Sequence, residues 1–152
     1  MSLDGLDLEA LMREALAEAE AAGAAGEYPI GAVVAVRGEI VGRGRARHNE
    51  ARSQLAHAEL AALQDGGEPL WLHFEEAVLA TTVEPCPLCL GAAVMADVPH
   101  IVFALHDPLV ESGLIVEAVP YVRRHIVSYV GGVLEAESRA LWDRYRPGWG
   151  RP

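Results

Sequence analysis

His57-Ala58-Glu59 and, later in the chain, Pro85-Cys86-Pro87-Leu88-Cys89 are the two stretches that decide what this sequence builds. Together they offer one imidazole and two thiols as soft metal ligands, and one carboxylate that the metal does not need. Structural zinc is normally enclosed by four Cys or His ligands, whereas catalytic zinc takes three and leaves the fourth position to water. The chain has only two cysteines. His57, Cys86 and Cys89 are therefore predicted to hold one catalytic zinc ion.

The carboxylate between these ligands has a separate task. Two thiolates nearly cancel the charge of Zn²⁺, so the metal is expected to acidify its water less than an all-histidine site would. A nearby base is then needed. Glu59 is the predicted catalytic residue, because it can take a proton from water and deliver it to a leaving group.

The spacing of the ligands predicts where the metal lies. His57 and Glu59 are two residues apart, nearly opposite around an ideal helix, so the metal must lie off the N-terminal end of their helix. Cys86 and Cys89 follow prolines at an expected helix start, where the positive helix end favours thiolate. A lone C-x-x-C is also compatible with a redox dithiol, which metal analysis of the purified protein would reveal.

An alternating pattern of strands and helices surrounds these motifs. Helical spacing predicts helices at Asp7–Ala22, His57–Gln64 and Val133–Arg146 and after the cysteines, and strands are expected at Ile30–Val36, Glu39–Arg43, Ala77–Val83, His100–Leu105 and His125–Val130. Asp65-Gly66-Gly67 should end the helix that carries His57. Residues 106–124 are long enough for a helical crossover, so the last two strands should be parallel. Pro120 within it must begin a helix or form a bend. The fold class is α/β, a three-layer α/β/α sandwich around a mixed five-stranded sheet.

The two motifs resemble those of a known enzyme superfamily. H-x-E followed by P-C-x-x-C is the signature of zinc nucleobase deaminases. Pro29–Val34 and Gly91-Ala92-Ala93 are similar to the tRNA adenosine deaminase, guanine deaminase and fungal-type cytosine deaminase branch of the zinc-dependent cytidine/deoxycytidylate deaminases. The resemblance is close over Tyr28–Leu105. It implies a cytidine deaminase-like fold, hydrolytic deamination and a homodimer.

Composition limits the setting and the partners. A chain of 152 residues without a long apolar run or a signal-peptide pattern is expected to be a single cytoplasmic domain, residues 1–152, with no membrane partner. Its formal net charge of −10 repels a polyanion unless a local basic patch overrides it. Arginines cluster at 43–52 and 123–146. They are read most simply as solvated faces paired with acids, and RNA binding by them is left open.

The substrate contacts rest mainly on the resemblance. The family's Gly-x-Gly-x-Asn-Arg stretch has alanine, Ala46, where its base-contacting Asn would stand. Asn49 or His48 could replace that contact, or both could be exposed loop residues. His106 and Asp107 follow a strand end, where ligands of α/β sheets commonly bind. An Asp-Pro turn is the alternative there. The substrate-binding residues are expected to be Ile30, Gly31, Ala32, Asn49, Ala58, Pro85, His106, Asp107 and Trp149.

The predicted function is hydrolytic deamination of a free nucleobase or small nucleoside, such as cytosine, guanine or a related amino-heterocycle. Trp149 supports a small substrate, since fungal-type cytosine deaminases resemble this Arg-Pro ending with a Trp that closes over the base. The alternatives are the wobble adenosine of tRNA and a non-catalytic zinc scaffold or partner subunit. The scaffold would leave Glu59 unused.

Overall fold

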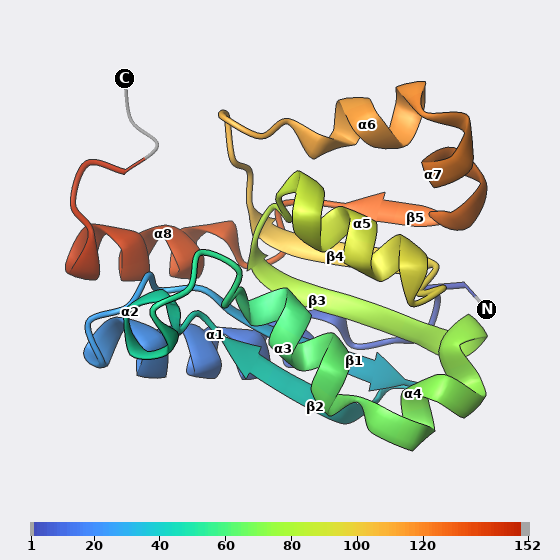
Figure 1. Ribbon diagram of the computed structural model, residues 1–152, viewed down its shortest axis with the longest axis horizontal. Coiled ribbons are helices and arrows are strands. Elements are labelled where there is room, and N and C mark those ends of the chain that lie inside the picture. Colours follow the sequence, from blue (N-terminus) through green and yellow to red (C-terminus); the bar gives the residue numbers. More distant parts are fainter. Residues whose placement is uncertain (1, 150–152) are drawn as a thin grey trace.

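The computed structural model describes residues 2–149, and its centre is a five-stranded sheet (Figure 1). The strands lie in the order β2-β1-β3-β4-β5. β1 is antiparallel to β2 and β3, whereas β3, β4 and β5 are parallel. The predicted mixed sheet is thus confirmed. The strands are β1 (Gly31–Val36), β2 (Glu39–Arg45), β3 (Ala77–Val83), β4 (His100–Leu105) and β5 (Ser128–Val130).

Helices cover both faces of the sheet, which confirms the three-layer architecture (Figure 1). One face packs on α1 (Leu8–Ala24) and the start of α8 (Glu135–Tyr145). The other face packs on the helices that carry the two motifs and on those of the β4–β5 crossover. The motif helices are α3 (Ala58–Asp65) and α5 (Pro87–Met95), and the crossover helices are α6 (Ser112–Ala118) and α7 (Pro120–His125). α4 (Gly67–His73), which follows α3, packs on the same face. Strands β1, β3 and β4 are buried along their whole length.

The crossover between β4 and β5 is helical, as predicted, and Pro120 begins α7. Proline suits a first helical turn because the amide hydrogen it lacks would have no partner there. β5 differs from the expectation. It starts at Ser128 and not at His125, because α7 continues through His125.

Three short elements were not predicted from the sequence. α2 (His48–Ala51) is one short turn of helix, and α4 follows α3 immediately. The Asp65-Gly66-Gly67 stretch does end α3, but Gly67, with a φ of 51°, only bends the chain into α4. A short 3₁₀ turn, η1 (Phe74–Glu76), then leads into β3.

Two glycines of β2 let α3 lie directly against the sheet. A Cβ on Gly44 would be 2.1 Å from the Ala58 carbonyl oxygen, and one on Gly42 would be 2.3 Å from that of Ala62. Both glycines face α3, because residues two apart in a strand share a face. This close approach sets the position of the α3 N-terminus, where the first motif lies. Among residues 2–149, no helix has the length and apolar character needed to cross a membrane.

Candidate active site

The predicted metal ligands meet where two helices begin. His57 is the N-cap of α3 and Cys86 is the N-cap of α5, with Cys89 one turn further along α5. Their ligand atoms all lie within 4.8 Å of one another. Both helices direct their N-terminal ends at this group, and that polarity favours thiolate over thiol. The metal position is therefore off the end of α3, as its spacing predicts.

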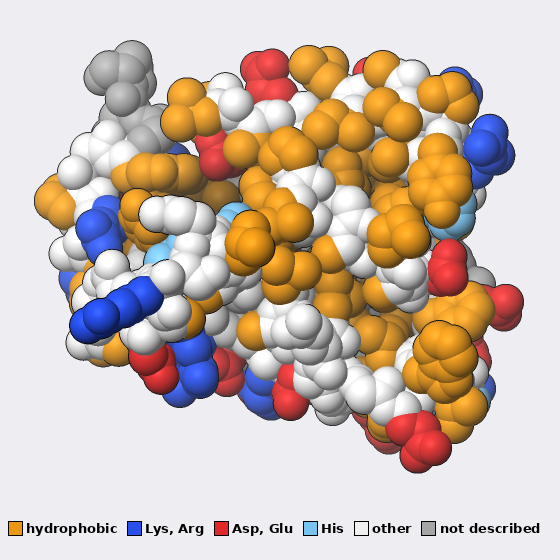
Figure 2. All heavy atoms as spheres, in the orientation of Figure 1, with side chains coloured by type: hydrophobic (Ala, Val, Ile, Leu, Met, Phe, Trp, Pro, Cys, Tyr) orange, Lys and Arg blue, Asp and Glu red, His pale blue; other side chains and the backbone are white. Residues whose placement is uncertain are grey.

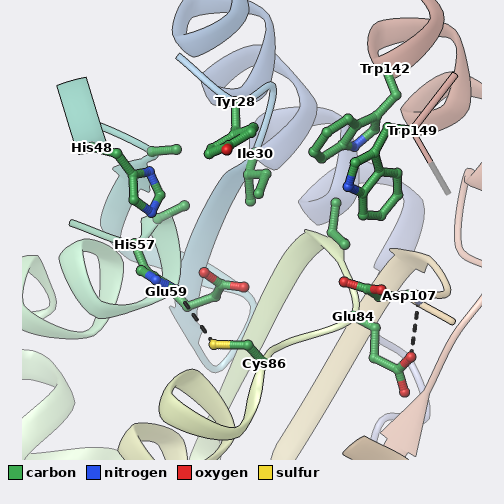
Figure 3. A pocket seen from close by; sticks show the side chains of 13 residues that line it. Tyr28, Ile30, His48, His57, Glu59, Glu84, Cys86, Asp107, Trp142 and Trp149 are labelled. Atoms are coloured by element: carbon green, nitrogen blue, oxygen red, sulfur yellow. Dashed lines mark hydrogen bonds between the residues drawn. The ribbon is translucent and has the colours of Figure 1, made fainter. Parts of the chain in front are cut away.

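The histidine ring is oriented for metal binding. The Nε2–H of His57 donates to the Gln54 carbonyl oxygen at 2.8 Å, which leaves the Nδ1 lone pair facing the thiols. Nδ1 lies 3.5 Å from Cys86 Sγ (Figure 3) and 3.3 Å from Cys89 Sγ. Bonds of about 2.3 Å to sulfur and about 2.0–2.1 Å to nitrogen at a tetrahedral angle would place these atoms about 3.6 Å apart. The three residues fit zinc.

The two thiol groups have opposite pKa shifts, so that one of them is ionised and the other keeps its proton. A hydrogen bond from Cys89, with a further contribution from His57, lowers the pKa of Cys86 to about 4. Cys89 is shifted in the opposite direction, because its hydrogen bond with Cys86 and its burial raise the pKa of its thiol. The hydrogen bond with Cys86 also raises the pKa of His57. Two sulfurs and an imidazole nitrogen form a soft donor set, and metal binding releases the protons that they hold.

Glu59 lies beside the ligands, and Thr81 and the Cys89 thiol hold its carboxylate in place. Its side chain is 5% exposed. Thr81 Oγ1 donates to Glu59 Oε1 at 3.1 Å, and the Cys89 thiol lies 3.4 Å from Oε2. Burial raises the pKa of Glu59 above its ordinary value. A carboxyl group that holds its proton more readily than usual is suited to carry a proton between water and substrate.

A cavity of about 280 Å³ opens above the metal group (Figure 3). Four of the predicted substrate residues line it: Ile30, Ala58, Asp107 and Trp149. Trp149 stacks on Trp142, with ring centroids 3.9 Å apart and planes at 20°. The aromatic wall therefore includes Trp149, which the sequence analysis identified, and a second tryptophan, Trp142, stacked against it.

The structure does not bring the other predicted substrate residues to this cavity. Gly31 faces α1, where a Cβ would be 2.2 Å from the Ala15 carbonyl oxygen, and Ala32 packs under α3. The Asn49 side chain donates to the Gly26 carbonyl oxygen. His106 packs edge-on against Phe103 and lines a neighbouring hollow, and Pro85 is buried before Cys86.

Several lining residues escaped the sequence analysis. The cavity is also lined by Tyr28, Ala46, His48, Val83, Glu84 and Trp142. Trp142 lies in the helix that the sequence predicted, but it was not identified as a cavity residue, and His48 was named only as a possible replacement for the missing asparagine. Glu84 accepts from the Asp107 backbone N–H and from the Tyr129 hydroxyl, both at 3.1 Å. These partners come from the loop after β4 and from β5, far along the chain from Glu84, so no local motif indicates that Glu84 lines the pocket.

Comparison with known proteins finds a matching family and similar proteins over most of the chain. The model for the cytidine and deoxycytidylate deaminase zinc-binding region matches residues 6–105. The tRNA-specific adenosine deaminase of Bacillus subtilis (strain 168) is 38% identical over 141 residues, which cover 90% of this chain and 87% of that relative. The tRNA-specific adenosine deaminase of Streptococcus pyogenes serotype M18 (strain MGAS8232) is 38% identical over 94 residues, covering 60% of this chain and 58% of the relative.

Solved structures with the same fold include one from a tRNA deaminase study and one of a guanine deaminase. A structure from biochemical and structural studies of A-to-I editing by tRNA:A34 deaminases has a TM-score of 0.74 and 33% identity, and the match covers 87% of this chain and 98% of that one. The guanine deaminase of Nitrosomonas europaea shares the fold, with a TM-score of 0.72 and 24% identity over 92% of this chain and 85% of that one. With its matching zinc-binding region and its His-Cys-Cys group, this chain belongs to the cytidine and deoxycytidylate deaminase family and is a zinc-dependent hydrolytic deaminase.

Proposed function

We propose that this chain deaminates the wobble adenosine of a tRNA to inosine. The observation that carries the proposal is the 38% identity to a tRNA-specific adenosine deaminase along 90% of the chain. The 33% identity to a structure from work on tRNA:A34 deaminases supports it. The expectation of a free nucleobase or small nucleoside as substrate and partner is wrong, because these relatives are tRNA deaminases.

In this proposal the metal group and Glu59 have separate roles. His57, Cys86 and Cys89 hold zinc, which supplies a water of lowered pKa when bound. The net reaction replaces the amino group on C6 of adenine by oxygen from water and releases ammonia. Glu59 accepts one proton of the attacking water and delivers it to N1 as C6 becomes tetrahedral. It then takes the remaining proton from the oxygen on C6 as the C=O bond forms, and delivers it to the departing amine as the C–N bond breaks. Its contact with Thr81 holds the carboxylate in place for both transfers.

The cavity accommodates one base taken out of a stack. Enzymes that act on a base in a nucleic acid extrude it into a closely fitting pocket and stack it between aromatic or apolar side chains. The cavity of about 280 Å³ has Tyr28, Trp142 and Trp149 on one side and Ile30 beneath them (Figure 3). We assign Trp149 to this stacking wall.

The distribution of arginines supports an RNA partner in spite of the acidic net charge. Arg43, Arg45 and Arg47 each lie within 4.0 Å of a glutamate, so the first cluster is largely neutralised. Arg139 and Arg146 are different, since neither forms an ion pair within residues 2–149. Arg146 lies 4.7 Å above the Tyr28 ring, and Arg139 donates to the Trp149 carbonyl oxygen. Two uncompensated cations thus border the aromatic wall, where a phosphate can approach.

A substrate comparison tests the proposal. We expect inosine formation in an anticodon stem-loop with adenosine at position 34, and a kcat/KM at least about 100-fold lower for adenosine, cytosine and guanine as free compounds. The physical reason is that loop binding supplies energy that a free base lacks, and this energy orients the base at the reacting centre. Deamination of a free base together with an inert stem-loop would overturn the proposal.

We further infer that the protein is a homodimer that works in the cytoplasm, where the tRNA is found and the thiol ligands stay reduced. Hydrophobic side chains gather on the face that carries α4, α5 and α6 (Figure 2). Trp71 and Met95 are 77% and 73% exposed there, and patches of this kind commonly mark interfaces. Light scattering should give the mass of two chains, and Trp71→Glu should shift it toward one. The mass of a single chain for the unaltered protein would refute the dimer, and cell fractionation tests the compartment.

A further inference from the structure

His48 begins the short helix α2 on the side of the cavity opposite the tryptophans (Figure 3). The helix is held in place by a buried carboxylate, that of Glu27, which is 4% exposed. Its two oxygens accept the backbone N–H groups of Asn49 and Glu50, each at 2.9 Å. An anchor of two charge-assisted bonds keeps α2, and with it the His48 ring, in one position.

The ring itself is packed but not fully hydrogen-bonded. It meets the edge of Tyr28 with centroids 5.4 Å apart, and it lies 5.0 Å from the ring of the metal ligand His57. His48 Nδ1 is buried and has no hydrogen-bond partner within residues 2–149. Buried polar atoms without a partner are uncommon in folded proteins, and each calls for an explanation such as a bound water or a functional role.

Trp142 Nε1 is also buried without a partner within residues 2–149, but it belongs to the aromatic wall across the cavity from the metal group. Outside that wall, the other polar side chains of the cavity already have roles. His57, Cys86 and Glu59 form the reacting centre, while Glu84 binds the Asp107 backbone on the far side. Ala46 lines the same wall as His48 and is 1% exposed, but its methyl group offers no hydrogen bond. An imidazole supplies both a donor and an acceptor from its two ring nitrogens. His48 is therefore the available polar contact beside the metal group.

We propose that His48 hydrogen bonds to N7 of the target adenine and so sets which edge of the purine faces the reacting centre. The inference rests on the proposed function. Water adds at C6, and the proton that this addition requires on N1 comes from Glu59. N7 is the other ring nitrogen bordering the amino group. The His48 ring lies 5.0 Å from the ring of His57, and in this proposal N7 faces His48 when N1 faces Glu59. His48 is a specificity-determining residue that does not bind the metal.

Variants at position 48 test the contact. His48→Ala should lower kcat/KM for the stem-loop about tenfold, the equivalent of one lost hydrogen bond of about 1.4 kcal/mol. His48→Gln, which retains an amide donor, should recover part of that loss. Zinc content should stay at one ion per chain in both, which separates a substrate contact from an indirect effect through His57. Ala51→Ser, at an exposed position on the same helix, is the matched control and should behave like the unaltered protein.

A modified substrate identifies the atom. A stem-loop with 7-deazaadenosine at position 34 lacks N7, so it should be about tenfold poorer for the unaltered enzyme and no poorer than adenosine for His48→Ala. Penalties that multiply would overturn the proposal, as would full activity of both position-48 variants. Coupling of His48 to a 2′-deoxy substitution instead would also overturn it, because the contact would then be to the ribose. An unaltered enzyme that forms no inosine in any stem-loop would reject the proposed function itself.

Discussion

Replacing Glu59 by glutamine is expected to lower kcat for inosine formation by about 10³–10⁴-fold while zinc remains bound. Glutamine keeps the shape of the side chain and can still accept from Thr81, whose hydroxyl lies 3.1 Å from the carboxylate. It cannot take up and release the proton. The loss should lie at the upper end for general acid–base catalysis, because the same carboxylate acts at two points of the reaction. Single-turnover kinetics on the stem-loop and zinc analysis measure the two quantities.

The matched control is Glu84→Gln, a second buried carboxylate of the same cavity. Glu84 is bonded to the Asp107 backbone and to Tyr129, and not to the thiols, so its replacement should cost far less than that of Glu59. Near-normal turnover by Glu59→Gln at unchanged zinc content would remove Glu59 from the mechanism. Equal losses in the two variants would show that a general disturbance of the cavity, and not proton transfer, is responsible.

Replacing Cys86 by alanine is expected to abolish both zinc binding and turnover. Only three described residues form the metal group, so the loss of one leaves two ligands for an ion that needs at least three from the protein. Activity should fall by more than about 100-fold, the upper end for loss of a group that merely orients a metal ligand. The melting temperature should also fall, because metal binding favours the folded state over the unfolded one. Elemental analysis, kinetics and thermal unfolding measure these effects.

Leu88→Ala, between the two cysteines on α5, serves as the matched control for zinc content, since its side chain is 40% exposed. Removal of zinc from the unaltered protein by a chelator should reproduce the Cys86→Ala phenotype, and added zinc should restore only the unaltered protein. An active, metal-free protein whose thiols form a reversible disulfide would contradict the zinc site and favour the redox dithiol.

Much of the fold follows from local patterns. β3 and β4 have the predicted bounds, because both strands are buried along their whole length and are therefore mostly apolar, which marks them clearly in the sequence. The His57, Cys86 and Cys89 group was predicted from residue type and spacing, and the structure brings its ligand atoms within 4.8 Å of one another. α2 was missed because its four residues have no periodicity, and its stability depends on Glu27, which lies on the other side of β1 and β2 in the sequence. Contacts of this kind are visible only after folding.

The substrate was misjudged for a physical reason. Net charge averages over the whole surface, whereas RNA is recognised by the few cations near the site. Most arginines of the first cluster are paired with glutamates, as expected, but Arg139 and Arg146 at the aromatic wall are not paired with carboxylates within residues 2–149. Trp149 was correctly placed near the cavity, yet a stacking wall serves a base in a tRNA loop as well as a free base.

The most direct test of the central claim is to map inosine by sequencing in a full-length tRNA that carries adenosine at position 34 and unpaired adenosines elsewhere in the anticodon loop. The account predicts inosine at position 34 alone, formed by the zinc-loaded protein and not by Glu59→Gln. A tRNA left unchanged by an enzyme that releases ammonia from free guanine or cytosine would contradict it.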